Sequence, residues 1–151
     1  MCAEDLPAVM AIEQALFSDP WTQGMYEDEI TMHEAWVLEL GEEIAGMACG
    51  WRVLDEYQLT NIGIAPRWHR HGLARKLLAW VLARQLTFGC RVAYLEVRVS
   101  NEPAIGLYES FGFTVVGKRR DYYRHPVEDA LVMAMQLKRN EPEGAQPVPR
   151  R

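Results

Sequence analysis

The sequence has few cysteines, and their number and spacing are typical of neither a metal site nor a disulfide framework. It contains three, Cys2, Cys49 and Cys90, in 151 residues, and none of them forms a C-x-x-C pair. An odd number without that spacing argues against a zinc knuckle and against the cross-linked scaffold of a small secreted protein. We expect all three to be reduced.

Long apolar runs and an excess of basic charge are also missing. No run reaches the roughly 18 apolar residues of a membrane-spanning helix, and the N-terminus lacks the basic-then-apolar layout of a signal peptide. The formal net charge is -5, which argues against nucleic acid as the main partner because phosphate contacts need a broad basic face. We therefore expect a cytoplasmic protein with no membrane or nucleic-acid partner, whose acidic surface suits a basic protein or peptide.

Composition and length describe one globular domain with a tail. Apolar residues make up 49% and charged residues 25% of the chain, which are ordinary values for a soluble domain. Residues 139–151 are polar and rich in proline, a composition that does not build a core. We expect a folded domain over residues 1–138 and a disordered tail over residues 139–151.

Hydrophobic periodicity predicts an α/β domain with a mixed sheet. The expected helices cover residues 4–17, 22–33, 72–88 and 101–112, and the expected strands cover 35–40, 41–54, 56–65, 91–99, 113–123 and 129–137. Thr22 and Asn101 are the N-caps of two of these helices. A strand, a long helix and another strand in succession predict one parallel crossover inside an otherwise antiparallel sheet.

The segment RWHRHGLARKLL, residues 67–78, concentrates basic residues around a glycine at the start of a predicted helix. Free backbone N–H groups and the positive end of a helix dipole attract a phosphate, and missing side chains allow it to come close. Arg70 and Arg75 can add ionic contacts. The segment matches neither a Walker loop nor G-x-G-x-x-G, and alone it fits a helix cap with an exposed basic face equally well.

Two motifs together carry a family resemblance: NIGIAPRWHRHGLARKLL and, further on, YLEVRVSNEPAIGLYESFGF. The sequence resembles the GCN5-related N-acetyltransferase (GNAT) superfamily, whose pyrophosphate loop reads Q/R-x-x-G-x-G/A, from about Glu4 to Leu137. With the ending RRDYY…EDALVMAM, it is most similar to the RimI-type ribosomal-protein-alanine N-acetyltransferases. The resemblance implies a mostly antiparallel central sheet with one parallel pair splayed at the acetyl-CoA site, and about four helices.

Three features depart from the family pattern. His69 occupies the first position of the loop motif, where the family has Gln or Arg, and Ala74 replaces the commoner glycine at its last position. Alanine is still small enough for an anion to approach, whereas His69 must make a different contact. The chain also begins almost at the first helix, so we expect the family's first edge strand to be short or absent.

The resemblance implies acetyl-CoA as co-substrate and no metal. Its pyrophosphate would bind the backbone of the loop, and its pantetheine arm would pair like an added strand with the end of the strand before it. The implied cofactor-binding residues are Ile62, Gly63, Ile64, Arg70, His71, Gly72, Leu73, Ala74, Arg75 and Asn101. Gly63 independently fits a strand bulge or a close backbone approach, and it fits a simple packing glycine too.

Glu96 and Tyr108 are the implied catalytic residues. Glu96 lies in AYLEVRV on the face opposite the apolar residues, and a carboxylate there must be neutralised by Arg98 or a neighbour, or border a cleft. The resemblance makes Glu96 the general base. Helical spacing places Tyr108 beside Phe111, as a packing residue with its hydroxyl bonded, whereas the resemblance makes it the acid that protonates the CoA thiolate.

The acceptor implied by the resemblance is the N-terminal alanine of a basic ribosomal protein, small-subunit protein eighteen. An α-amine with a pKa of about 8 is easier to neutralise than a lysine by about 3 kcal/mol, which favours an N-terminus. Aromatic and acidic residues flank the expected acceptor groove: Trp21, Tyr26, Glu27, Asp28, Glu29, Asp121, Tyr122 and Tyr123. The alternatives are a broader protein N-terminal or small-amine N-acetyltransferase and a non-catalytic CoA-binding module.

Overall fold

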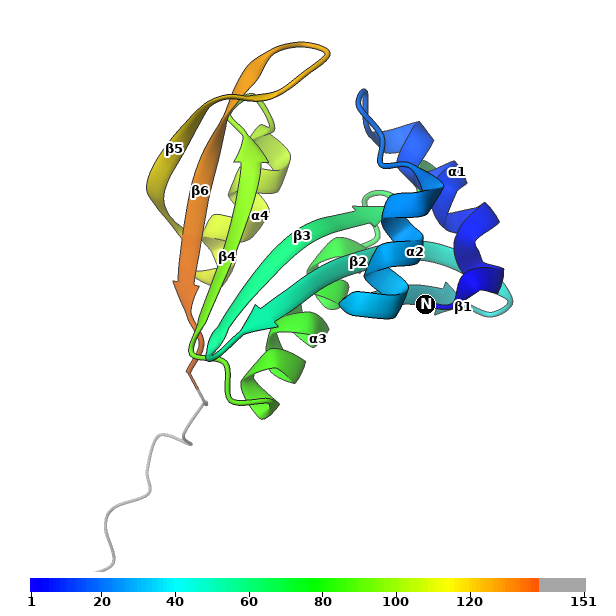
Figure 1. Cartoon of the computed structure of the whole chain (residues 1–151), viewed down its shortest axis with the longest axis horizontal. Coiled ribbons are helices and arrows are strands. Elements are labelled where there is room, and N and C mark those ends of the chain that lie inside the picture. The colour runs from blue at the N-terminus through cyan, green and yellow to red at the C-terminus, as the bar shows by residue number, and fades with distance from the viewer. Residues whose placement is uncertain (139–151) are drawn as a thin grey trace, which may run out of the picture.

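The computed structural model describes residues 1–138, in which the helices and strands follow one another in the predicted order (Figure 1). The predicted tail, residues 139–151, lies outside the described residues. The elements are a 3₁₀ helix η1 (Ala3–Asp5), α1 (Leu6–Leu16), α2 (Gln23–Met32), β1 (Glu34–Leu40), β2 (Glu43–Val53), β3 (Glu56–Ile64), a 3₁₀ helix η2 (Pro66–Trp68), α3 (Leu73–Thr87), β4 (Val92–Arg98), α4 (Glu102–Phe111), β5 (Thr114–Tyr123) and β6 (Glu128–Gln136).

The strands form one mixed sheet in the order β1-β2-β3-β4-β6-β5. Four of the five neighbouring pairs are antiparallel, and β3 and β4, which α3 connects, are parallel. The predicted crossover and mixed sheet are therefore confirmed. Within residues 1–138 no strand precedes α1, and β1 forms that edge of the sheet.

The parallel pair separates partway along its length. β3 and β4 are paired only from Glu56 opposite Val92 to Leu59 opposite Leu95, and beyond that point the two strands diverge (Figure 1). The register between β2 and β3 shifts at the same place, because Cys49 faces Asn61 while the next residue faces Leu59. Thr60 has no partner residue in β2 and forms a β-bulge. The bulge bends β3 away from β4.

The prediction of a bulge at Gly63 is wrong. Gly63 stays in register opposite Met47, and a Cβ atom there would lie 2.6 Å from Cδ1 of Leu16 on α1. The missing side chain lets α1 pack directly against the backbone of β3. Gly63 is therefore a packing glycine, which was the alternative interpretation of this position.

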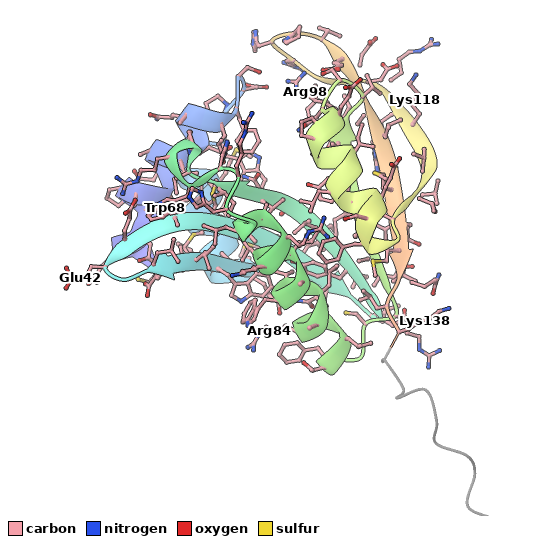
Figure 2. All side chains as sticks on the ribbon, turned by 180° about the vertical axis from the view of Figure 1, so that it is seen from behind. Glu42, Trp68, Arg84, Arg98, Lys118 and Lys138 are labelled. Carbon is pink, nitrogen blue, oxygen red and sulfur yellow. The ribbon has the colours of Figure 1, made fainter. Side chains whose placement is uncertain are left out.

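Helices cover the two faces of the sheet separately. α1 and α2 pack on the β1–β3 half, and α3 and α4 lie on the opposite face, as the view from behind shows (Figure 2). One core joins α3 and α4 to the sheet through residues that include Leu59, Leu77, Leu78, Val81, Leu95, Tyr108, Phe113 and Met133. A second core lies under α1 and α2 and includes Leu6, Val9, Ile12, Tyr26, Met47 and Cys49. None of the helices in residues 1–138 is long and apolar enough to span a membrane.

Candidate active site

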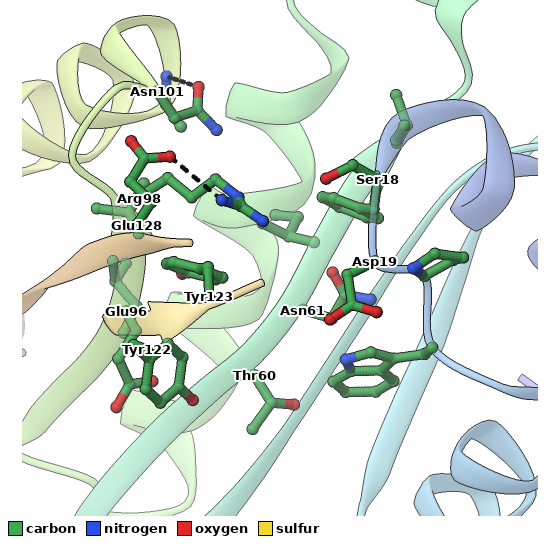
Figure 3. A pocket seen from close by; sticks show the side chains of 18 of the residues that line it. Ser18, Asp19, Thr60, Asn61, Glu96, Arg98, Asn101, Tyr122, Tyr123 and Glu128 are labelled. Atoms are coloured by element: carbon green, nitrogen blue, oxygen red, sulfur yellow. Dashed lines mark hydrogen bonds and ion pairs between the residues drawn. The ribbon is translucent and has the colours of Figure 1, made fainter. Parts of the chain in front are cut away.

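A cavity of about 780 Å³ opens where β3 and β4 separate. One wall comes from β3 and the segment between α1 and α2, and the other from β4, α4 and the turn between β5 and β6 (Figure 3). The structure places four of the predicted catalytic and cofactor-binding residues in this lining: Ile62, Glu96, Asn101 and Tyr108. Of the residues predicted beside the acceptor groove, Trp21, Tyr122 and Tyr123 also line it, whereas Tyr26, Glu27, Asp28, Glu29 and Asp121 do not. Gly63, Ile64 and residues 70–75 are not part of it.

Glu96 faces the cavity from the middle of β4. The strand alternates as predicted, with Ala93, Leu95 and Val97 buried and Glu96 half-buried on the other face. Oε2 of Glu96 accepts a hydrogen bond of 3.1 Å from Nε2 of Gln58, and Oε1 lies 3.3 Å from Nε of Arg119. The carboxylate thus borders a cavity and has a cationic neighbour, which comes from β5.

Arg98 pairs with Glu128 and not with Glu96, whose carboxylate it was a candidate to neutralise. Its guanidinium lies 3.2 Å from Oε1 of Glu128 and donates to the carbonyl oxygens of Arg124 and Pro126 at 2.8 and 3.0 Å. Glu128 also accepts from the hydroxyl and backbone N–H of Ser100, and these bonds together with Arg98 hold the pKa of Glu128 below its ordinary value. Arg98 therefore fastens the β5–β6 turn to the end of β4.

Tyr108 reaches the cavity from the buried face of α4. Its side chain is 7% exposed and its ring meets Phe113 edge-on at 5.8 Å. The predicted bond to its hydroxyl is not found: within residues 1–138 Tyr108 is bonded through its backbone, whose carbonyl oxygen accepts from the N–H of Phe113 at 3.1 Å. Burial raises the pKa of Tyr108 to about 12, so the phenol is fully protonated at neutral pH.

Asn101 begins α4 at the rim of the cavity. Its Oδ1 accepts from the backbone N–H of Ala104 at 3.3 Å, which confirms the predicted N-cap. Since the cap uses only the side-chain oxygen, the amide nitrogen stays available to a ligand.

The loop before α3 offers a row of backbone donors. Arg70 and Gly72 adopt left-handed backbone conformations, with φ of 63° and 71°. The backbone N–H groups of residues 72–75 make no hydrogen bond to a backbone carbonyl in the described chain, as expected for the first turn of a helix. Unpaired N–H groups at the positive end of a 15-residue helix fit a phosphate group.

Three side chains of this loop make their contacts with groups other than these N–H donors. His69, the departure from the family pattern, places Nε2 2.7 Å from the carbonyl oxygen of Ile64 and so ties the loop to the end of β3. Nδ1 of His71 lies 2.8 Å from the carbonyl oxygen of His69. The guanidinium of Arg75 lies over the ring of Phe111 on α4, 5.4 Å from its centre.

The wall of the cavity also contains a buried carboxylate that was not among the residues predicted from the sequence. Glu13 on α1 is 1% exposed and accepts hydrogen bonds from the backbone of Trp21, the hydroxyl of Tyr26 and the side chain of Asn61. The sequence contained a signal for this residue, because Glu13 lies on the same helical stripe as the apolar residues Leu6 and Val9.

Among residues 1–138, no three potential metal ligands come together.

Buried tyrosines predict a loss of stability in alkali. Burial raises the pKa of Tyr26, Tyr57 and Tyr123 as well as that of Tyr108. The unfolded chain releases these protons from about pH 10 while the folded protein keeps them, so the stabilisation is complete below pH 10 and falls above it. Tyr108 alone contributes a loss of about 2 kcal/mol by pH 12.

Urea denaturation at pH 8, 10 and 11 measures this effect. The free energy of unfolding is expected to fall between pH 10 and 11, and to fall less in Tyr108→Phe than in the wild type. A free energy that is constant over this range would contradict the assignment of protonated, buried phenols.

Comparison with known proteins agrees with this geometry. A sequence profile of the acetyltransferase (GNAT) family matches residues 6–113. The [ribosomal protein bS18]-alanine N-acetyltransferase of Salmonella typhimurium is 38% identical over 136 residues, which cover 88% of this chain and 92% of that one. The crystal structure of the ribosomal-protein-S18-alanine N-acetyltransferase from Escherichia coli superposes with a TM-score of 0.86 and 34% identity, over 95% of this chain and 94% of that one.

The chain belongs to the acetyltransferase (GNAT) family. Members of this family take the acetyl group from acetyl-CoA. A fold neighbour, the NatC complex, has been crystallised with a Gag peptide and CoA, and superposes with a TM-score of 0.79 at 19% identity. The predicted fold, with its splayed parallel pair, is confirmed.

Proposed function

We propose that this protein transfers the acetyl group of acetyl-CoA to the α-amine of the N-terminal alanine of ribosomal protein bS18. The observation that carries the proposal is the likeness to enzymes named for this reaction, which extends over nearly the whole described chain. The cavity supports it, because a carboxylate and a protonated phenol line the place where the strands separate. A ribosomal acceptor implies a cytoplasmic protein.

The donor and the acceptor would reach the cavity from opposite faces of the sheet. The free N–H groups of residues 72–75 lie at the start of α3, and α3 covers one face (Figure 2). The segment between α1 and α2 lines the cavity from the other face. An anionic donor therefore fits the α3 side, and a peptide fits the α1–α2 side.

The end of β3 fits the extended part of the donor. Beyond Leu59 the strand has lost its β4 partner, so its edge offers free backbone groups to an added strand. The proposed contacts are the backbone of Ile62, Gly63 and Ile64 for the pantetheine arm, residues 70–75 for the pyrophosphate, and the amide nitrogen of Asn101. The thioester supplies an activated acetyl carbonyl.

Glu96 takes the proton from the acceptor's ammonium or attacking amine, directly or through a water molecule. As the new N–C bond forms, the C–S bond breaks and the electron pair leaves with sulfur. Tyr108 donates its hydroxyl proton, or a strong hydrogen bond, to the departing thiolate. Because the pKa of Tyr108 is about 12, full proton transfer to a thiolate of pKa about 8.5 is uphill by about 5 kcal/mol, which favours the hydrogen bond.

The charge of the cavity suits a basic acceptor. Its lining contains the carboxylates of Glu13, Asp19, Glu96 and Glu128 and a single guanidinium, that of Arg98. Among the described residues Asp19 forms no ion pair, and it lies on the acceptor side (Figure 3). A peptide with a positive side chain after its first residue would find an uncompensated negative charge there.

The second candidate function is acetylation of a broader set of protein N-termini. The relative from Mycobacterium tuberculosis, 35% identical over 135 residues, which cover 81% of this chain and 80% of that one, is named N-alpha-acetyltransferase RimI without one substrate. A non-catalytic CoA-binding module remains the alternative of another class. Its cavity would not need both Glu96 and Tyr108.

A peptide panel tests the proposal. Peptides beginning Ala-Arg, Ala-Glu and Ser-Arg, a polyamine and an aminoglycoside are incubated with enzyme and acetyl-CoA, and the products are identified by mass spectrometry. We expect acetylation at the α-amine of the Ala-Arg peptide, and none of the same peptide with its N-terminus blocked. Equal rates on all peptides favour the broader enzyme, and acetyl-CoA binding without any product favours the binding module.

A further inference from the structure

The strongest unexplained feature of the described chain is a buried carboxylate without a cation. Glu13 and Gln85 are the buried polar side chains in residues 1–138, and no Lys, Arg or His lies within ion-pair distance of Glu13 in that range. Removing a carboxylate from water is costly unless donors replace the water. Its surroundings must therefore supply those donors.

Three neutral donors surround Glu13. Oε1 accepts from the backbone N–H of Trp21 at 2.8 Å, and Oε2 accepts from the hydroxyl of Tyr26 at 2.6 Å and from Nδ2 of Asn61 at 2.9 Å. Nδ2 of Asn61 also lies 2.9 Å from the Tyr26 hydroxyl oxygen. Every contact of Glu13 is that of an acceptor, as an ionised carboxylate requires.

These donors come from the parts of the protein that build the acceptor side of the cavity. Trp21 lies next to the N-cap of α2 in the segment between α1 and α2, which contributes Ser18 and Asp19 to the lining. Asn61 follows the Thr60 bulge, where β3 leaves β4. Glu13 therefore links the exposed acceptor wall to the point at which the sheet separates.

We propose that Glu13 is the positioning residue of the acceptor wall: its carboxylate holds the α1–α2 segment at Trp21 and β3 at Asn61 in a fixed relation before the peptide arrives. The α1–α2 segment forms no helix or strand between the end of α1 and Thr22. The hydrogen bond from the backbone N–H of Trp21 to Glu13 fixes the end of this segment that precedes α2. The assignment of the bound molecule as a peptide acceptor rests on the proposed function.

The test compares Glu13→Gln with Gln14→Ala, an exposed position on the same helix. A glutamine amide has one acceptor oxygen and cannot serve the backbone N–H of Trp21 and the other two donors together. We expect the Michaelis constant for the Ala-Arg peptide to rise about tenfold, the factor for one lost bond to a charged group. The kcat and the dissociation constant of acetyl-CoA stay at wild-type values, and Gln14→Ala behaves as wild type.

A second measurement does not depend on the proposed function. In protein labelled with ¹⁵N-tryptophan, hydrogen exchange of the Trp21 amide is expected to be about tenfold faster in Glu13→Gln, while the amide of Trp36 on β1 keeps its rate. Tyr26→Phe retains the bond between Glu13 and Trp21, so it should leave the Trp21 amide protected. Glu13→Asp, which keeps the charge, is the variant to use if Glu13→Gln does not fold.

The outcomes separate the two proposals. If the wild type acetylates none of the peptides, the proposed function fails and exchange of the Trp21 amide alone decides the role of Glu13. Unchanged exchange in Glu13→Gln, or faster exchange of the Trp21 and Trp36 amides together, overturns the positioning role. A fall in kcat at constant Michaelis constant overturns it too, since Glu13 would then act on the chemical step.

Discussion

Replacing Glu96 with Gln is expected to lower kcat by about 10²–10⁴-fold, the usual contribution of general acid–base catalysis. The amide keeps the size of the side chain and still accepts from Gln58, which donates to it at 3.1 Å. It cannot accept the proton of an attacking amine. Affinity for acetyl-CoA should change little, because the polar partners of Glu96 are Gln58 and Arg119, and residues 70–75 lie outside the cavity lining.

Turnover by mass spectrometry and acetyl-CoA binding by calorimetry check this prediction in the same preparation. Glu39→Gln is the matched control, since Glu39 is an exposed residue on β1, away from the cavity lining. If Glu96→Gln acetylates the peptide as fast as the wild type, another group is the base. If acetyl-CoA binding is lost as well, the substitution has damaged the site as a whole.

Tyr108→Phe is expected to lower kcat by about 10- to 100-fold and to change the dissociation constant of acetyl-CoA much less. Only the hydroxyl is removed, which is not bonded to another residue in the described range, and the ring that contacts Phe113 stays. The loss of kcat measures how much the hydroxyl stabilises the thiolate in the transition state. We expect this contribution to be no larger than that of one hydrogen-bond donor in an oxyanion hole. Since the pKa of Tyr108 is about 12, its ionisation should not shape the pH–rate profile below pH 10.

Steady-state kinetics from pH 6 to pH 10 test this prediction, with Tyr94→Phe as control. Tyr94 lies two residues before Glu96 and outside the cavity lining. Equal losses of kcat and of acetyl-CoA affinity would reduce Tyr108 to a packing residue. A wild-type rate that falls with a pKa below 10 and becomes flat in Tyr108→Phe would contradict the buried, protonated phenol.

Local pattern was enough to predict the elements of the fold. Alternation in β4, with Ala93, Leu95 and Val97 on one side, placed Glu96 on the open face, and the cap at Asn101 fixed the start of α4. These features depend on neighbours in sequence. The order β4-β6-β5 depends on pairing between distant segments, which leaves no such signal.

The errors and omissions at the site have physical reasons. A glycine in a strand fits a bulge or a close contact, and only the position of Leu16 on α1 decides between them at Gly63. Glu96 and Arg119 come from strands that β6 separates in the sheet, so their pairing could not be inferred. Glu13 was visible as a charge on an apolar stripe, but its three donors lie in other elements.

The two halves of the sheet are not equally enclosed. α1 and α2 pack against the β1–β3 half, which has helices on both of its faces. Within residues 1–138, the half formed by β4, β6 and β5 has a helix on one face, α4, and its other face is uncovered (Figure 1). Side chains on an uncovered surface can change in size without creating a cavity or a steric clash, whereas side chains in a packed interior cannot. This is where proteins of the same architecture can diverge in substrate preference without losing the ability to fold.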